Sequence, residues 1–298
     1  MCTYYGDSFL PAQLDSIDRQ SYPNIELWVS DDGGDSGTQE ILRDFQVYFR
    51  PRNMRVLRGP GKGFVANFMS QLMNPAIDAE YFALSDQDDV WEKDKVAVAI
   101  DALSSVPDEK PAVYCSRTRL IDESGNDIGY SPLFSKQPSF RNALIQSIAG
   151  GNTMVLNRSA RDMLIAANQS EVVCHDWWIY LLITGAGGTV IYDSNSKIGY
   201  RQHGRNLIGS GGGWVDRVKR GLMLMADRHR QWNRVNLKAL SQTRALLTEE
   251  NCRLCDEMAA LGQKGWVGRL AFIRRAGLYR QTRLGTVSLY IAALFNKL

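Results

Sequence analysis

The chain has 298 residues, of which 44% are hydrophobic and 22% are charged. This is ordinary globular composition, with enough material to bury a sizeable core in one large domain, or in one domain with a helical extension. The formal net charge is only +3, which is too small to argue for nucleic acid as a bulk partner, and we expect none.

Short apolar runs alternate with amphipathic stretches in the first part of the chain. Apolar residues at helical spacing predict helices over residues 9–19, 38–49 and 64–73. Continuous apolar runs predict strands over residues 25–29, 54–57 and 81–84. Strands and helices that alternate at this interval indicate βαβ units, and therefore an α/β fold with a mostly parallel, Rossmann-like sheet flanked by helices.

The middle of the chain has a mixed pattern. Strands are expected over residues 113–115, 153–156 and 189–192, and helices over residues 159–167 and 176–183. After a glycine loop at residues 209–213, the stretch 214–257 is helical in pattern and highly charged. We therefore expect a first domain over residues 1–210 and a basic helical C-terminal extension over residues 211–298.

The end of the chain is basic. From Gly262 onward it has seven Lys and Arg residues and no acid, so the residues before it carry a net charge of −4. Aromatic residues such as Trp266 and Tyr290 alternate with the basic ones. A segment of this kind can lie on anionic lipid headgroups. It can equally be a pair of helices packed on the first domain, or a contact between subunits.

The cysteines and the hydropathy pattern bear on the compartment. Five cysteines are an odd number, which argues against a disulfide framework. Cys252 and Cys255 form an isolated C-x-x-C pair, so we expect reduced thiols rather than a structural zinc site. No signal peptide and no apolar run near the ~20 residues that span a bilayer is evident. We expect a cytoplasmic protein, soluble or peripheral on the inner face of the cytoplasmic membrane.

An acidic cluster follows the strand expected at residues 81–84. Asp86, Asp88 and Asp89 place three carboxylates within four residues, which repel one another unless a cation neutralises them. Hard oxygen ligands suit Mg²⁺ or Mn²⁺, which completes its shell with phosphate oxygens and water. A departing diphosphate needs such charge compensation. The alternative is a solvated turn in which an aspartate caps the next helix.

A second acidic turn, Ser30-Asp-Asp-Gly-Gly34, ends an earlier strand. Acids at the carboxyl edge of such a sheet often accept hydrogen bonds from ribose hydroxyls. The alternative is an Asp-Gly turn that needs no ligand.

Three further segments carry chemistry. Asp176 stands beside Trp177 and Trp178 at a helix start, where a partly desolvated carboxylate could act as general base and the indoles could support a sugar ring. The alternative is a capping aspartate with core tryptophans. Gly150-Gly-Asn152 lets backbone approach a ligand closely, or makes a turn. Tyr200-Arg-Gln-His203-Gly offers an imidazole and a guanidinium, although a lone histidine is more often structural.

Together these segments resemble family 2 glycosyltransferases of the GT-A fold, especially their rhamnosyltransferase-like branch. The matching segments are Thr3-Tyr-Tyr-Gly6, Gln13-Leu-Asp-Ser16, Ser30-Asp-Asp-Gly33, Ser85-Asp-Gln-Asp-Asp-Val-Trp91, His175-Asp-Trp177 and Tyr200-Arg-Gln-His-Gly204. Their order and spacing agree to about residue 210, and the rest of the chain agrees only in general character.

The resemblance implies a role for each matching residue. It implies that the nucleotide sugar is bound by Thr3, Tyr4, Asp31, Asp32, Lys62 and Asp86. Asp86 and Asp88 would be the metal-binding D-x-D pair, with Asp89 in support and His203 as a further metal ligand. Asp176 would be the catalytic base. Gly150 and Gly151 would form the glycine-rich loop near the acceptor.

Two positions depart from the family pattern. Only Met1-Cys2 precedes the T-Y-x-G segment, so the first strand is expected to be missing or truncated. Tyr5 stands where the family usually has asparagine, so the contact that this asparagine would make is not predicted here.

The resemblance implies an inverting transfer. A sugar, rhamnose or another hexose, would move from a dTDP- or UDP-linked donor to a hydroxyl of a glycan or lipid-linked glycan in bacterial cell-surface polysaccharide synthesis. The divalent metal would be Mg²⁺ or Mn²⁺. Two rival interpretations are a non-catalytic nucleotide-sugar or glycan-binding protein on the same scaffold, and a nucleotidyltransferase. Gly59-Pro-Gly-Lys-Gly63 lacks the Ser or Thr of a P-loop, which weakens the second rival.

Overall fold

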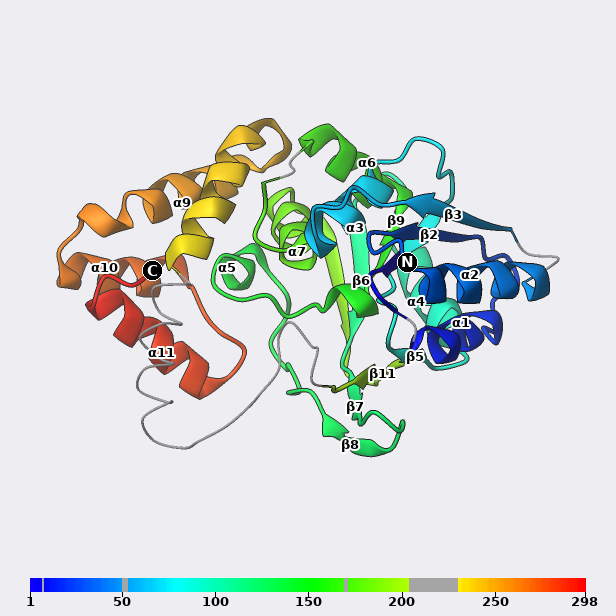
Figure 1. The fold of residues 1–298 in the computed structure, drawn as a ribbon. Coiled ribbons are helices and arrows are strands. Elements are labelled where there is room, and N and C mark those ends of the chain that lie inside the picture. Colours follow the sequence, from blue (N-terminus) through cyan, green and yellow to red (C-terminus); the bar gives the residue numbers. More distant parts are fainter. Residues whose placement is uncertain (7, 50–52, 169–170, 204–229) are drawn as a thin grey trace. The chain divides into compact units, whose positions relative to one another are not determined.

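The computed structural model describes residues 1–6, 8–49, 53–168, 171–203 and 230–298 (Figure 1). These residues form two compact units. The first contains residues from 1–133, 149–168 and 189–203, and the second those from 134–148, 171–188 and 230–298. The predicted boundary at residue 210 lies outside the described residues.

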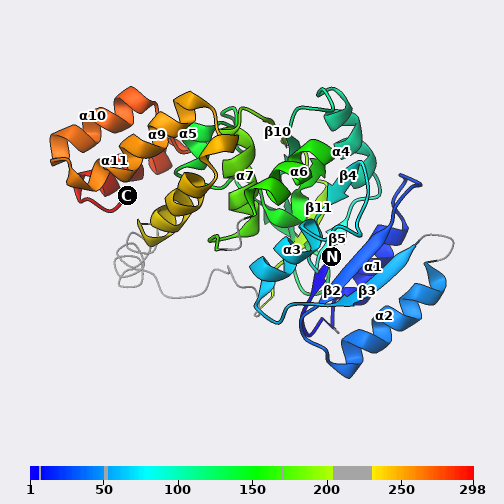
Figure 2. The ribbon, with the colours of Figure 1, turned by 90° about the horizontal axis from the view of Figure 1, so that it is seen from above.

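Three parallel strands begin the first unit. They are β1 (Cys2–Thr3), β2 (Leu27–Asp31) and β3 (Met54–Arg58), in the order β1-β2-β3. The helices α1 (Leu10–Asp18) and α2 (Ser36–Tyr48) accompany this sheet (Figure 2). Leu14 of α1 and Leu42 of α2 share one apolar core with Val29 of the buried strand β2. These elements confirm the predicted alternation of strand and helix, and β1 is two residues long.

A second sheet has the order β10-β6-β9-β4. Its strands are β4 (Tyr81–Ala83), β6 (Ala112–Ser116), β9 (Val155–Asn157) and β10 (Thr189–Asp193). The helices α3 (Phe64–Leu72), α4 (Lys95–Ser104) and α6 (Arg158–Ala167) flank the strands of the first unit. β10 pairs with β6 in parallel, whereas β9 is antiparallel to β6 and β4. The α/β fold is as predicted, with antiparallel pairs added to its parallel framework.

A third, small sheet was not predicted from the sequence. It has the order β5-β11-β7-β8, with β5 (Val90–Trp91), β7 (Arg119–Ile121), β8 (Asp127–Tyr130) and β11 (Ile198–Arg201). β11 runs antiparallel to β5 and parallel to β7. This pairing brings the residues that follow β11 beside the acidic turn that precedes β5.

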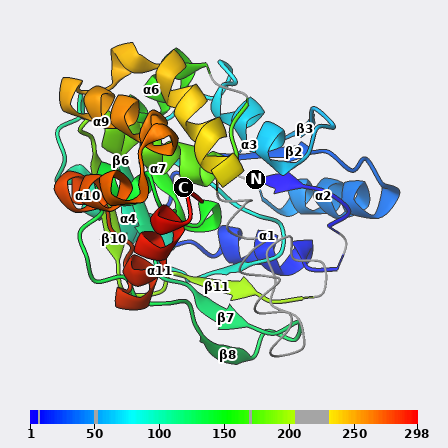
Figure 3. The same cartoon turned by 90° about the vertical axis from the view of Figure 1, so that its left-hand side faces the viewer.

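The second unit is helical. Its elements are α5 (Phe140–Ala143), α7 (His175–Gly185), a helix over residues 230–242, η2 (Arg244–Leu246), α9 (Glu249–Ala259), η3 (Leu261–Gln263), α10 (Trp266–Ala276) and α11 (Arg283–Leu294). The views in Figures 2 and 3 show α10 and α11 side by side. No helix in the described residues has both the length and the apolar character needed to cross a bilayer.

Two segments of the second unit come from the part of the sequence that we assigned to the first domain. They are residues 134–148 and 171–188. Their polar contacts explain the grouping, because Asn142 Nδ2 donates to the carbonyl of Tyr279 (3.0 Å) and Asn251 Nδ2 donates to that of Gly185 (2.8 Å). α5 and α7 are therefore joined to the C-terminal helices by hydrogen bonds that no periodicity reveals.

Candidate active site

The first acidic turn begins where β2 ends. Asp31 is buried and accepts four hydrogen bonds, from Thr3 Oγ1 (2.8 Å), Gln39 Nε2 (2.5 Å) and the backbone N–H groups of Gly33 and Gly34 (3.3 and 3.0 Å). The carboxylate thus links the end of β1 to the start of α2. The contact between Thr3 and Asp31, both predicted on the nucleotide side, is present.

Asp32 fixes the glycine-rich turn that carries Lys62. Its Oδ1 accepts from the backbone N–H of Gly61 (2.8 Å). A Cβ on Gly59 would lie 2.1 Å from the same oxygen, so only glycine fits there. Lys62 is exposed at this turn. Asp32 and Lys62, which are distant in the sequence, therefore belong to one local structure.

Gln87, which we did not single out, joins the segment at residues 3–6 to the acidic cluster. Its Nε2 donates to the carbonyl of Tyr4 (3.0 Å), and the backbone N–H of Tyr4 donates to its Oε1 (2.7 Å). The Tyr4 ring stays exposed. Tyr5 has φ 48°, in the left-handed region that asparagine tolerates better than tyrosine. This backbone geometry gives a physical reason for the asparagine that the family resemblance leads us to expect at this position.

Asp88 and His203 are in direct contact. Asp88 Oδ2 and His203 Nε2 are 2.9 Å apart, and the histidine side chain is only 8% exposed. The Phe9 ring lies against the imidazole, with ring centroids 5.0 Å apart. The two residues are predicted metal ligands, and they are brought together by the pairing of β11 with β5.

Arg201 anchors the acidic turn to the small sheet. Its Nε donates to the carbonyl of Asp88 (2.9 Å), and its Nη1 donates to the carbonyls of Asp122 and Glu123 (3.0 and 2.8 Å). The guanidinium is buried and lies over the Phe9 ring. The Arg201 side chain therefore fixes the position of the Asp88 backbone. It also packs on the Phe9 ring that contacts His203.

We expect Arg201→Lys to destabilise the first unit by about 2–4 kcal/mol, because lysine cannot replace a buried guanidinium that donates to three carbonyls. Differential scanning calorimetry, which can resolve separate transitions, would measure the change. Arg158→Lys is the matched control, since Arg158 makes an exposed ion pair with Asp78 and should change stability by less than about 0.5 kcal/mol. Equal stability of the two variants would contradict the anchoring role.

Asp89 is fully buried behind the turn. Its carboxylate accepts from Asn152 Nδ2 (2.7 Å) and from the backbone N–H of Arg201 (3.1 Å). Burial, with the negative charges of Asp86 and Asp88, raises the pKa of Asp89 well above its usual value. A Cβ on Gly150 would lie 2.9 Å from Asn152 Oδ1. The Gly150-Gly151 turn thus helps to place Asn152 on Asp89, a contact that the sequence did not indicate.

Lys95, the first residue of α4, is another missed residue. It is fully buried, and its Nζ lies 3.7 Å from the centroid of the Trp91 ring without a hydrogen-bond partner among the described residues. Burial lowers the pKa of Lys95 to about 7, while the charges of Asp89 and Asp86 oppose that shift. A lysine in the first turn of a helix is unfavourable because its charge opposes the helix dipole. This unusual position was the one feature of the sequence that could have drawn attention to Lys95.

The ligand set fits a metal that is shared with a substrate. No three His, Cys, Asp or Glu side chains converge on a metal position in the described parts of the chain. Asp88 and His203 provide an oxygen and a nitrogen ligand that face each other. Mg²⁺ and Mn²⁺ commonly take one or two protein ligands and complete their shell with phosphate oxygens and water. The pair therefore suits an ion that binds together with a diphosphate.

Asp176 lies in the second unit, in the first turn of α7. Its side chain is half-buried, and its Oδ1 accepts from the backbone N–H of Trp177 (2.6 Å). Trp177 donates from Nε1 to the carbonyl of Ala143 (2.7 Å), and Trp178 is fully buried. The tryptophans are core residues, so the idea that they support a sugar ring is wrong. Asp176 itself remains the predicted base.

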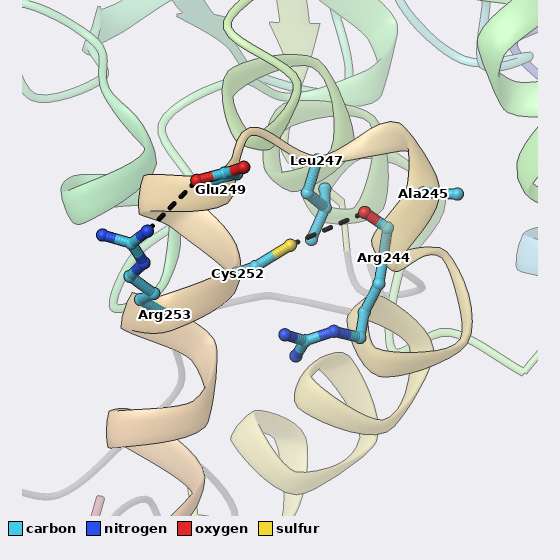
Figure 4. Close-up of a pocket in the computed structure, with 6 residues that line it drawn as sticks. All are labelled: Arg244, Ala245, Leu247, Glu249, Cys252 and Arg253. Carbon is cyan, nitrogen blue, oxygen red and sulfur yellow. Dashed lines mark hydrogen bonds and ion pairs between the residues drawn. The ribbon is translucent and has the colours of Figure 1, made fainter.

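A surface hollow in the second unit contains none of the predicted site residues (Figure 4). It is lined by Arg244, Ala245, Leu247, Glu249, Cys252 and Arg253. Arg253 is paired with Glu249, and Cys252 Sγ donates to the carbonyl of Arg244 (3.5 Å). None of the five cysteines is in a disulfide. The hollow is the joint between η2 and α9, and its charged groups are engaged there.

Comparison with known proteins gives a family and a fold. The family model described as glycosyl transferase family 2 matches residues 1–164. The dTDP-rhamnosyl transferase RfbG of Shigella flexneri is 26% identical over 235 residues, which cover 74% of this chain and 77% of RfbG. An uncharacterized glycosyltransferase of Rickettsia typhi is 24% identical over 211 residues, which cover 67% of this chain and 62% of the relative.

Two solved structures share the fold at low sequence identity. The mannosyltransferase PcManGT from Pyrobaculum calidifontis, in complex with GDP-Man and Mn²⁺, has a TM-score of 0.53 and 18% identity, covering 99% of this chain and 85% of the other. S. aureus TarS in complex with UDP-GlcNAc has a TM-score of 0.52 and 14% identity, covering 99% and 89%. The fold is the predicted GT-A fold.

Proposed function

Since this chain belongs to glycosyl transferase family 2 and is a glycosyltransferase that uses a nucleotide sugar, we propose that it transfers rhamnose from a dTDP-linked donor with inversion at the anomeric carbon. The similarity to RfbG supports the choice of donor. The contact of Asp88 with His203 is the structural observation that carries metal-dependent use of a nucleotide sugar, because it joins two metal-ligand types from distant segments at the acidic turn. Another hexose, or UDP in place of dTDP, is the alternative within the same reaction.

The donor side of the proposal rests on one connected set of contacts. Asp31 is bonded to Thr3, and Tyr4 is bonded to Gln87 in the acidic turn. Tyr4 is exposed and is proposed to lie against the base, with Asp31 and Asp32 holding the nucleoside. Lys62 is proposed to approach the phosphates. Asp88 and His203, with Asp86 beside them, would hold Mg²⁺ or Mn²⁺, whose charge compensates that of the departing diphosphate.

Asp176 is proposed as the general base. It would take the proton of the acceptor hydroxyl while that oxygen forms the bond to the anomeric carbon and the bond to the diphosphate breaks on the opposite face. A single displacement of this kind inverts the configuration. Gly150 and Gly151 are proposed to lie near the acceptor, for which we propose a glycan or lipid-linked glycan of bacterial cell-surface polysaccharide synthesis, made on the cytoplasmic side of the membrane.

A panel of nucleotide sugars tests the donor. We expect dTDP-rhamnose with Mn²⁺ to raise the unfolding temperature of the full chain more than UDP-glucose or GDP-mannose does, because only the preferred donor fills both the nucleoside and sugar sites. Adding EDTA should remove most of the shift. An equal response to all donors, or none with Mn²⁺ present, would argue against the proposed specificity.

A further inference from the structure

The helix α11 exposes an apolar face. Its inward side is given by Leu289 and Ala293, which are fully buried. On the opposite side are five large apolar residues that are exposed: Leu284 (84%), Val287 (55%), Ile291 (52%), Leu294 (40%) and Phe295 (66%). At about 100° per residue they fall within roughly 100° of arc, so they form one stripe along the helix and its C-cap. We call these five residues the α11 stripe.

The stripe is held on a rigid support. Arg269 of α10 donates from Nε to the carbonyl of Ala293 (2.6 Å) and from Nη2 to that of Leu294 (2.9 Å). Asn296 Nδ2 donates to the carbonyl of Gly262 (3.4 Å). The C-terminal end of α11 thus lies against the start of α10, where Trp266 and Val267 are also exposed.

Basic residues flank the stripe at both ends. Arg283 is exposed at the start of α11, next to the edge of the apolar arc. Lys264 is exposed just before α10, and its carbonyl accepts from Arg269 Nη1 (2.6 Å). No acid occurs between Gly262 and Leu298. An exposed apolar patch with a basic border and no negative charge matches the chemistry of an anionic bilayer surface.

We infer that the α11 stripe docks this enzyme on an anionic lipid surface, with the apolar side chains in the headgroup and acyl boundary and Lys264 and Arg283 on the lipid phosphates. The same face is poorly suited to a second copy of the chain. A symmetric dimer would place one stripe on another and set their basic borders against each other. The inference deepens the proposed function and rests on it for the lipid-linked nature of the acceptor.

Vesicle flotation of the full chain tests the inference. We expect wild type to float with vesicles that contain phosphatidylglycerol and to float much less with phosphatidylcholine alone. Leu284→Gln/Ile291→Gln/Phe295→Gln should lower the partition coefficient at least about tenfold, because it removes three apolar anchors from the surface of a folded helix. Val47→Gln/Tyr48→Gln is the matched control, since both residues are exposed on α2 and should leave flotation unchanged.

The charge of the border is tested separately. Lys264→Gln/Arg283→Gln should weaken flotation with anionic vesicles and reduce its salt dependence. Failure of wild type to float, or unchanged flotation of the α11 variant, would overturn the inference. So would sedimentation showing that wild type is a dimer and the α11 variant a monomer while neither binds vesicles.

Measurements of donor binding and sugar transfer distinguish a failure of this inference from a failure of the proposed function. The α11 variant should bind dTDP with Mn²⁺ as wild type does, and transfer sugar to a water-soluble acceptor at the wild-type rate. If flotation depends on the stripe but no protein transfers sugar, the docking surface stands and the proposed function fails. If transfer occurs but wild type does not float, the proposed function stands and the docking surface fails.

Discussion

Asp176→Asn is expected to lower kcat by about 10²–10⁴-fold, the usual contribution of a general base. Asparagine has the same size and keeps an oxygen that can accept from the Trp177 backbone N–H, so the start of α7 should remain intact. It cannot take a proton from the acceptor hydroxyl. Release of the nucleoside diphosphate in the presence of acceptor would measure kcat, and calorimetric titration would measure donor affinity, which should change less than about twofold.

Glu171→Gln is the control for this substitution. Glu171 is an exposed acid in the segment before α7, where it pairs with Lys238, so its loss should not affect turnover. Near-normal turnover of Asp176→Asn would remove Asp176 from the mechanism. A wild-type protein that binds donor but neither transfers nor hydrolyses it would instead support the non-catalytic alternative.

Asp88→Asn should abolish most metal-dependent donor binding. The substitution keeps the shape of the side chain and removes the negative charge that a divalent cation needs, so the Kd for dTDP with Mn²⁺ should rise by about a hundredfold or more. His203→Ala should weaken the same binding. If both residues hold one ion, the double variant should be little worse than Asp88→Asn alone.

The metal effect has its own controls. With EDTA, wild type and Asp88→Asn should bind dTDP equally weakly, because the proposed contacts of the nucleoside do not involve the ion. Asp127→Asn, which removes an exposed acid on β8, should leave the Mn²⁺ response unchanged. A full Mn²⁺ response in Asp88→Asn would show that the ion is held elsewhere.

The main elements of the fold could be predicted because their signals are local. Helical spacing located α1, α2 and α3, and continuous apolar runs located β2 and β6, both fully buried. Acids that directly follow a buried strand in an α/β pattern are placed at the sheet edge by the topology itself. That rule places Asp31 and Asp88 at the sheet edge from the sequence alone. Their partners Thr3 and His203 came from the family resemblance.

The features that were not predicted from the sequence depend on contacts between distant short segments. β5 is Val90–Trp91 and β11 is Ile198–Arg201, and strands so short have no periodicity to detect. Lys95 has an ordinary surface residue type, and only its environment makes it buried. From the sequence, the tryptophans beside Asp176 could equally form a platform for a ligand or belong to the core. Their burial in the structure shows that they belong to the core. Grouping of α7 with the C-terminal helices likewise rests on tertiary hydrogen bonds such as that of Asn251 with Gly185.

The pairing of β11 with β5 also has a consequence for the order of folding. Asp88 and His203 are separated by 115 positions, so their contact closes a long loop and has a high entropic cost of formation. During synthesis, a nascent chain that has been released only as far as α4 contains Asp88 but not His203. The proposed ion site is therefore completed late, when β11 has left the ribosome and joined the sheet.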